Sequence, residues 1–184
     1  MRPHIICHML SSVDGKIDGA ALDAVTGDGE YEATGAKLNG DAWICGRTTM
    51  QQHFAEDEPF VSASNTPAGH RPVVVARRAK SYAISVDTLG KLRWPDGDLD
   101  GDHLVCVVSE QVPEDYLAML REKRISYIVS GKSSVDLANA VNRLEEVAFC
   151  PRERGNQSIN HFPFRANSLR CFLRDEHEIV SCGV

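Results

Sequence analysis

The stretch 103–147, HLVCVVSEQVPEDYLAMLREKRISYIVSGKSSVDLANAVNRLEEV, decides the predicted fold. It begins with an apolar run at His103–Ser109 and carries a second one at Ile125–Val129, each with the length and the β-branched content of a buried strand. A helix is predicted after each run. Pro113 suits the first turn of the one over 112–120, and apolar residues recur at intervals of three or four in the one over 135–147. This alternation of strands and helices favours an α/β domain with a mostly parallel sheet.

Weaker signals of the same kind lie before this stretch. Three apolar runs are predicted to be strands: His4–Leu10, Asp41–Cys45 and Pro72–Ala76. Two helices are predicted, one over 27–39 and one that Thr48 or Thr49 caps and that runs through Phe54. The segment 58–71 is rich in proline, serine, asparagine and glycine and is predicted to be a loop, whereas 80–101 is charged and is predicted to be irregular.

The composition is that of one soluble domain. The chain has 184 residues, 42% of them hydrophobic and 25% charged, which is enough for a single core. A formal net charge of -6 argues against general binding to nucleic acid or to an anionic membrane. No apolar run approaches the ~20 residues that span a bilayer. The first residues lack the pattern of a signal peptide, so a cytoplasmic location is expected.

The cysteines give no sign of a metal or redox centre. No two of them form a Cys-x-x-Cys pair, and the sequence contains neither His-Glu-x-x-His nor another set of ligands with metal-binding spacing. We therefore predict no metal site. Cys7, Cys45 and Cys106 lie inside predicted strands, so we expect them to be buried and reduced.

Four turns that follow predicted strands are candidates for a ligand site, because ligands of parallel sheets bind beyond the carboxyl ends of the strands. They are expected to converge on one cleft and are Ser11–Gly15, Gly46–Thr49, Arg77 and Ser130–Ser133. Gly46 would let the backbone approach a phosphate where Arg47 adds a cation, although a plain strand-to-helix turn has the same pattern. Arg77 is of the type that grips the 2′-phosphate of NADPH, or else forms a solvated basic pair with Arg78.

The other two turns also have alternative interpretations. Ser130-Gly131-Lys132-Ser133 looks like the end of a P-loop, but the first glycine of that motif would fall at position 126, where the chain has Ser126. A phosphate-binding turn that includes Gly131 at the start of a helix stays open. Lys16, in Asp14-Gly15-Lys16, could bind an anionic substrate or orient a reacting group, or the segment could be a surface turn.

Four segments in sequence order carry a resemblance to a known family: Pro3–Ile17, Asp41–Thr49, Val73–Arg77 and Val135–Ala138. The first is similar to the first strand and the Ser-x-Asp-Gly-Lys/Arg turn of the pyrimidine reductases of riboflavin synthesis. The second is similar to a landmark that dihydrofolate reductase shares in altered form. The third takes the place of a strand with a phosphate-gripping arginine, and the fourth that of a Val-Asp-Leu helix start. The chain thus resembles a stand-alone member of that family over about residues 3–147.

The resemblance implies a dihydrofolate-reductase-like three-layer α/β/α sandwich and NADPH as cofactor. In the family a hydride moves to the ribosyl group of 5-amino-6-(5-phosphoribosylamino)uracil, a small-molecule substrate, and members are commonly homodimers. By resemblance, Lys16 is a catalytic residue on the substrate side, where Ser12, Asp14 and Gly15 bind the substrate. The residues expected to contact the cofactor are Gly46, Arg47, Thr48, Thr49, Arg77 and Gly131.

Two departures from the family pattern lead to further predictions. The aspartate that many members carry after the glycine turn falls near His53, and we hypothesise that His53 replaces it as a catalytic proton donor. Residues 1–147 are predicted to be the reductase domain, whereas 148–184 form an atypical segment of the same domain that lacks the family's apolar strand and Glu-Gly-Gly cofactor turn. We hypothesise that this segment is frame-shifted, which the nucleotide sequence of the gene would test. A missing central strand would leave sheet edges unpaired.

Two other functions stay open from the sequence. A dihydrofolate-reductase-like enzyme acting on another heterocycle would use the same fold, although no clear acidic helix of the pterin-binding type follows the first turn. A non-catalytic nucleotide-binding protein on the same scaffold would account for the loss of the Glu-Gly-Gly turn. The retained Lys16 and Gly46–Thr49 favour the enzyme.

Overall fold

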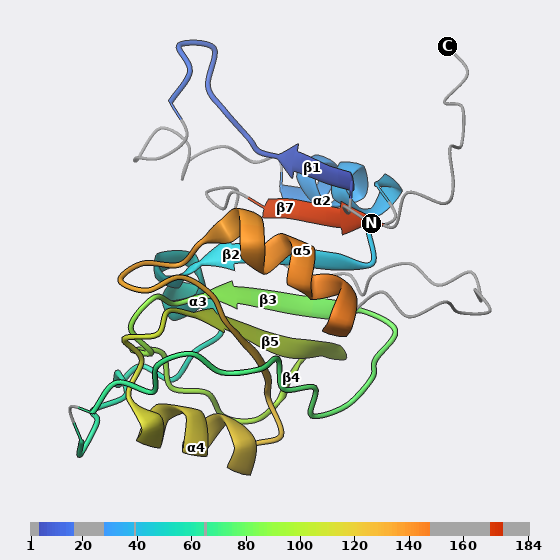
Figure 1. Ribbon diagram of the computed structural model, residues 1–184. Coiled ribbons are helices and arrows are strands. Elements are labelled where there is room, and N and C mark those ends of the chain that lie inside the picture. Colours follow the sequence, from blue (N-terminus) through green and yellow to red (C-terminus); the bar gives the residue numbers. More distant parts are fainter. Residues whose placement is uncertain (1–3, 17–27, 39, 65, 148–169, 175–184) are drawn as a thin grey trace.

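The computed structural model describes residues 4–16, 28–38, 40–64, 66–147 and 170–174 (Figure 1). The strands are β1 (His4–His8), β2 (Ala42–Gly46), β3 (Tyr82–Val86), β4 (Asp98–Leu99), β5 (Asp102–Val108), β6 (Ser126–Val129) and β7 (Arg170–Arg174). The helices are α2 (Asp28–Lys37), α3 (Arg47–His53), α4 (Glu114–Glu122) and α5 (Leu137–Val147). The elements form a mixed α/β structure.

All the described strands belong to one seven-stranded sheet. Its order is β1-β7-β2-β3-β5, with β4 and β6 both pairing with β5. The pairs β2/β3, β3/β5 and β5/β6 are parallel, while β7 is antiparallel to both β1 and β2. β1 therefore runs in the same direction as β2, and the prediction of a mostly parallel sheet is confirmed.

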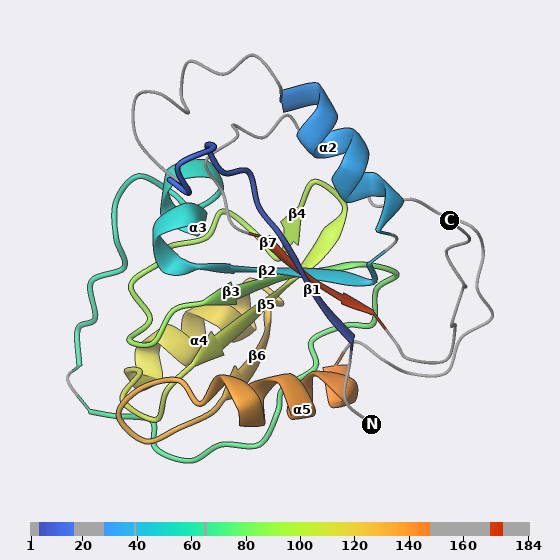
Figure 2. The ribbon, with the colours of Figure 1, turned by 90° about the horizontal axis from the view of Figure 1, so that it is seen from above.

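Side chains of β5 alternate between two hydrophobic clusters, as the period of two in a strand requires. One set, with Leu104 and Val108, packs with Met50 of α3 and Leu117 of α4. The other set packs with residues of α5, among them Leu144. Helices accordingly lie on both faces of the sheet, and Figure 2 shows α5 on one side and α3 on the other. Full burial of each large aliphatic side chain contributes about 2 kcal/mol.

Most elements predicted from the stretch 103–147 are confirmed. β5, α4, β6 and α5 lie within one to two residues of the predicted ranges. Pro113 is the N-cap of α4 and its φ of -65° suits the start of a helix. The predicted cap of α3 is wrong, because Thr48 and Thr49 lie inside the helix and the N-cap is Gly46, which has no side-chain hydrogen bond.

The predictions for 72–76 and 80–101 are wrong. Pro72–Ala76 is not a strand of the sheet: only Val74 pairs with Tyr127 of β6, through N···O distances of 3.0 and 2.9 Å. The central strand is β3, inside the segment predicted to be irregular. Its burial on both faces takes in Ser85 as well as Tyr82–Ile84, and this polar residue weakened the apolar signal in the sequence.

β7 lies between β1 and β2, so the expectation of unpaired edges there is wrong. Five residues of β7 are registered with β1, from His4↔Arg174 to His8↔Arg170, and three are registered with β2. The segments 148–169 and 175–184 lie outside the described residues, and so does the predicted loss of the Glu-Gly-Gly turn. The frame-shift hypothesis stays a prediction.

The described cysteines differ in exposure. Cys45 and Cys106 are buried in the sheet, as predicted. Cys7 is exposed, contrary to the prediction, because β1 is the outermost strand and most of its residues are exposed. Within the part of the chain that the structure describes, no helix has the length and apolar character needed to cross a bilayer.

His103 at the start of β5 is fully buried and is held as a neutral ring. Its Nδ1–H donates to the carbonyl oxygen of Gly97 (3.1 Å), and its Nε2 accepts from the hydroxyl of Ser126 (2.8 Å). Burial, with a smaller contribution from Arg77, lowers the pKa of His103 below its ordinary value of 6.5. Protonation of this ring would place a charge in a buried site and would force the Ser126 hydroxyl to turn, so that its oxygen accepts from Nε2–H.

We therefore expect the free energy of unfolding to fall as the pH drops through about 6.5. Below that pH, His103 is protonated in the unfolded chain but stays neutral in the folded protein until the pH reaches its lower folded-state pKa. Urea unfolding between pH 7.5 and 5.5 would measure the slope. His103→Gln should flatten it, whereas His70→Gln, at an exposed histidine, should not. Equal slopes in both variants would contradict the assignment to His103.

Candidate functional site

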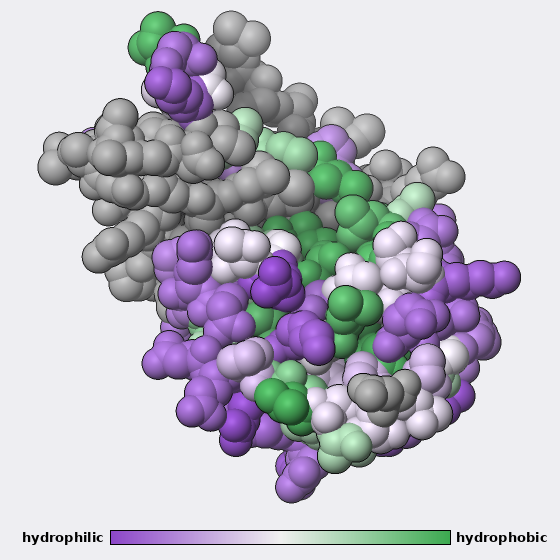
Figure 3. All heavy atoms as spheres, turned by 90° about the vertical axis from the view of Figure 1, so that its left-hand side faces the viewer, coloured by the Kyte–Doolittle hydropathy of each residue, from purple (hydrophilic) through white to green (hydrophobic). Residues whose placement is uncertain are grey.

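The carboxyl ends of the parallel strands meet at one edge of the sheet. Gly46 of β2 is registered with Val86 of β3, and Val86 with Val107 of β5. We call the edge marked by these three residues the carboxyl edge; in Figure 1 the arrowheads of β2 and β3 point to it. Figure 3 looks onto this side and shows hydrophobic residues (green) exposed among polar ones (purple). Such an edge is where parallel sheets bind ligands.

Gly46 is open to space at this edge. Its φ of -78° is available to any residue, and a Cβ added to it would meet nothing within 4 Å. The packing and backbone of the described chain therefore do not require glycine at this position. Arg47 and Thr48, the next two residues, are exposed in the first turn of α3, and Thr49 is half-buried. A ligand could approach the backbone here beside a cation.

The loops after β3, β5 and β6 are tied together at the carboxyl edge. Both the N–H and the hydroxyl of Ser109 donate to the carbonyl oxygen of Thr88 (3.1 and 2.8 Å). The N–H of Glu110 donates to the carbonyl oxygen of Gly131 (2.9 Å). Gly131 has φ +88°, and a Cβ there would lie 2.1 Å from the carbonyl oxygen of Ser134. The fold itself thus requires glycine at 131, unlike at 46.

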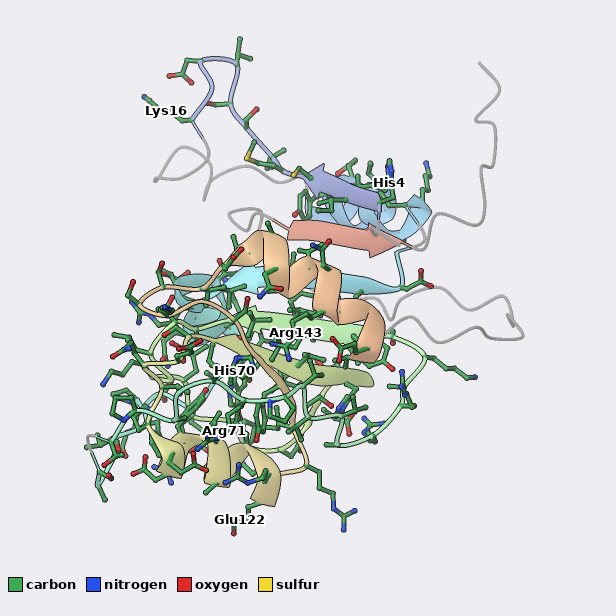
Figure 4. The ribbon with its side chains drawn as sticks, viewed as in Figure 1. His4, Lys16, His70, Arg71, Glu122 and Arg143 are labelled. Carbon is green, nitrogen blue, oxygen red and sulfur yellow. The ribbon has the colours of Figure 1, made fainter. Side chains whose placement is uncertain are left out.

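The turn Ser12–Lys16 follows β1 at the same end of the sheet but projects away from it. Ser12 closes the turn: its N–H donates to the carbonyl of Lys16 (2.8 Å) and its hydroxyl donates to Asp14 Oδ1 (2.5 Å). Gly15 has φ +80°, which favours glycine. The side chain of Lys16 is 68% exposed and pairs with Asp14 at 3.2 Å. Figure 4 shows Lys16 on an arm beyond the sheet.

The hydrogen bonds of this turn stabilise the charged form of the Asp14 carboxyl. The hydrogen bond from Ser12, and then that from Lys16, lower the pKa of the Asp14 carboxyl below its ordinary value. The three predicted substrate residues Ser12, Asp14 and Gly15 therefore form one closed unit with Lys16. The structure brings them together with each other, and β7 separates their strand from β2 and Gly46.

Arg77 does not join the other turns, so the prediction of a single cleft is wrong for this residue. It pairs with Asp98 of β4, and Asp98 is registered with His103 at the start of β5. This is the amino end of β5, opposite the carboxyl edge. The cause is the misassigned strand: Val74 pairs with the outer strand β6 instead of entering the centre of the sheet.

His53 also lies away from Gly46. It is the last residue of α3, two helical turns from the carboxyl edge, and it is exposed. Its ring contacts the ring of Phe54 edge-on, with centroids 6.2 Å apart. The predicted proton donor therefore lies at the opposite end of α3 from Gly46.

Asp87, which follows β3 at the carboxyl edge, was not predicted from the sequence as a site residue. It is 1% exposed, and its Oδ2 accepts from the N–H groups of Lys91 (2.6 Å) and Leu92 (2.7 Å). Burial raises the pKa of the Asp87 carboxyl above its ordinary value of 3.8, and the hydrogen bonds from Leu92 and Lys91, followed by the charge of Arg47, partly oppose this. An acidic residue directly after the apolar run Tyr82–Val86 was the available signal.

No protein-family model matches this sequence, and no curated protein matches it significantly. Among the described residues, no group of three or more histidine, cysteine, aspartate or glutamate side chains could hold a metal ion. The interpretation of the site therefore rests on its geometry and on the residues themselves.

Proposed function

We propose that the chain is an NADPH-dependent reductase of the riboflavin-synthesis type, with the dihydrofolate-reductase-like three-layer sandwich, that reduces the ribosyl group of a phosphoribosylamino-pyrimidine. The observation that carries the proposal is Gly46. This glycine ends a central parallel strand, faces open space and is not required by the fold. Since neither backbone conformation nor packing explains glycine here, the close approach of a ligand to the backbone is a remaining explanation.

The residues at the carboxyl edge suit part of a dinucleotide. Arg47 supplies an exposed cation for a phosphate group, and the hydroxyls of Thr48 and Thr49 are donors next to it. α3 has seven residues, so Arg47 is a stronger attraction for an anion than the short helix is. Arg77 is not part of the proposed site, because it lies at the opposite end of β5.

When bound, the cofactor would supply the hydride, and the protein would supply binding and orientation. β1 and β2 are two strand spacings apart, about 10 Å. A substrate lying across β7 would have the Gly46 turn on one side and the Ser12–Lys16 turn on the other. In this arrangement Lys16 would attract the substrate phosphate, and Ser12 and Asp14 would hold the lysine in its turn.

Gly46→Ala tests the proposal, with NADPH binding followed by fluorescence. We expect the wild-type chain to bind NADPH and the variant to bind it roughly tenfold more weakly, because a methyl group would occupy the space of the ligand. Stability should fall by no more than about 1 kcal/mol, the usual difference between Ala and Gly at an N-cap. A wild-type chain that does not bind NADPH would sink the proposal.

A second candidate is a nucleotide-binding protein without catalytic activity. The observation that favours it is Lys16, which lies on a projecting arm instead of beside Gly46. An oxidation assay of NADPH with the phosphoribosylamino-pyrimidine would separate the two functions. Turnover would support the reductase, and binding without turnover would support the second candidate.

A further inference from the structure

Two buried oxygens at the end of the central strand β3 have no hydrogen-bond partner among the described residues. They are Ser85 Oγ and Asp87 Oδ1, and the two residues are 0% and 1% exposed. Residues two apart along a strand share a face, so both side chains lie on one side of the sheet. In folded proteins the large majority of buried polar side-chain atoms bond to the protein or to ordered water. The pair therefore points to a shared partner.

Both side chains face the hydrophobic cluster that packs with α3 and α4. Ser85 is registered with Cys45 of β2 and with Cys106 of β5, and both cysteines belong to this cluster. Asp87 Oδ2 accepts from the N–H of Leu92 (2.7 Å), another member of the cluster. Burial, and then the charge of Asp87, raise the pKa of the Cys106 thiol well above its ordinary value, which places carboxylate and thiol near each other. The two oxygens thus lie inside the protein, below the carboxyl edge.

The sheet carries small side chains at this place. Cys45, Ser85 and Cys106 form one row across β2, β3 and β5. The adjacent row, whose side chains lie on the opposite face, consists of larger aliphatic residues, namely Ile44, Ile84 and Val105. A buried water needs about the space of one water-sized sphere and two to four polar partners. The row of small side chains is compatible with that space, and Ser85 and Asp87 supply two partners.

The neighbouring buried polar side chains have partners of their own. The indole N–H of Trp94 donates to the hydroxyl of Tyr116 (3.3 Å), and the thiol of Cys106 is hydrogen-bonded to both side chains. Ser109, which follows β5 and is fully buried, donates its hydroxyl to the carbonyl oxygen of Thr88 (2.8 Å). The lack of a partner is thus a property of Ser85 Oγ and Asp87 Oδ1 and is not shared by the polar groups around them.

We propose that Ser85 and Asp87 bind one buried water molecule, which accepts a hydrogen bond from the Ser85 hydroxyl and donates one to Asp87 Oδ1. Residues two apart along a strand are about 6.6 Å apart, and two hydrogen bonds through a water span up to about 5.6 Å between oxygens, so the bridge fits. Asp87 Oδ2 already holds the N–H groups of Lys91 and Leu92. The water completes the bonding of this carboxylate, which fixes the loop 87–92 beside the Gly46 turn. It is bound whether or not the chain uses NADPH.

A crystal structure of the wild-type chain that resolves ordered water tests the site directly. We expect a peak of electron density at hydrogen-bond distance, about 2.8 Å, from both Ser85 Oγ and Asp87 Oδ1. If no peak bridges the two oxygens, the proposal is overturned. A urea midpoint that depends on sodium or potassium at constant ionic strength would assign the peak to a cation instead of water, and would also overturn it.

Magnetic relaxation dispersion of oxygen-17 in water counts long-lived buried waters in solution. Ser85→Ala removes one of the two partners, and we expect this variant to lose a single long-lived water relative to the wild type. Ser109→Ala is the matched control, because it removes a buried hydroxyl that already bonds to Thr88, and it should keep the wild-type count. Equal counts in all three proteins, or equal losses in both variants, would overturn the assignment to Ser85. If Ser85→Ala does not fold, the wild-type crystal structure still decides.

Discussion

A chain that ends after residue 169 is expected to lose cooperative folding. The truncation removes β7, which is registered with five residues of β1 and three of β2. Without it, two strands keep rows of unpaired N–H and C=O groups, and β1 has no described partner in the sheet. The loss of about 5 kcal/mol or more would approach the whole stability of a typical domain. Circular dichroism during urea unfolding would measure it.

The matched control is a chain that ends after Arg174. It keeps β7 and its register with both neighbours. We expect this control to unfold cooperatively with nearly the full free energy of unfolding. If the two truncated chains had the same urea midpoint and slope, β7 would contribute nothing to the sheet and the pairing of β1 with β7 would be wrong.

Gly131→Ala is expected to lower the free energy of unfolding by about 3 kcal/mol, through both backbone strain and steric conflict. The backbone at 131 has φ +88°, and the new Cβ would lie 2.1 Å from the carbonyl oxygen of Ser134 and 2.7 Å from the N–H nitrogen of Asp136. The turn between β6 and α5 would have to open, and the hydrogen bond from the N–H of Glu110 to the carbonyl oxygen of Gly131 would be lost. Thermal or urea unfolding of the purified variant measures the change.

Gly69→Ala separates the two causes. Gly69 also has a positive φ, +67°, but a Cβ there would meet nothing within 4 Å. We expect this variant to lose about 1 kcal/mol from strain alone. If both variants lost the same free energy of unfolding, the steric conflict at Gly131 would contribute nothing to the destabilisation.

The sequence predicted the elements whose apolar signal is continuous. β5 and β6 are short runs of buried residues, and the helices after them have regular apolar spacing. β3 was missed because burial in the centre of the sheet is compatible with polar residues such as Ser85, so burial and hydrophobicity differ there. Pro72–Ala76 was assigned in its place because three valines look like a buried strand, although only Val74 pairs with a strand.

The site was predicted in part for the same reason. Gly46 and Arg47 follow a strand that the sequence shows clearly, and they lie at the carboxyl edge as expected. The positions of Arg77 and Asp87 depend on which run is the central strand, and that information is carried by contacts between distant segments. Once β3 is known, the position of Asp87 follows directly, because Val86, the residue before it, is registered with Gly46.

The pairing of β1 with β7 has a consequence for the order in which the chain is assembled. The two strands are roughly 160 residues apart, so their contacts form late and slowly compared with those of β5 and β6. During synthesis, β1 leaves the ribosome before the other described strands. It stays unpaired until β7 has been made, while α4 and α5 can already fold onto the strands between them. Its exposed Ile5 and Cys7 would then be open to chaperones, proteases and oxidants for longer than any other part of the sheet.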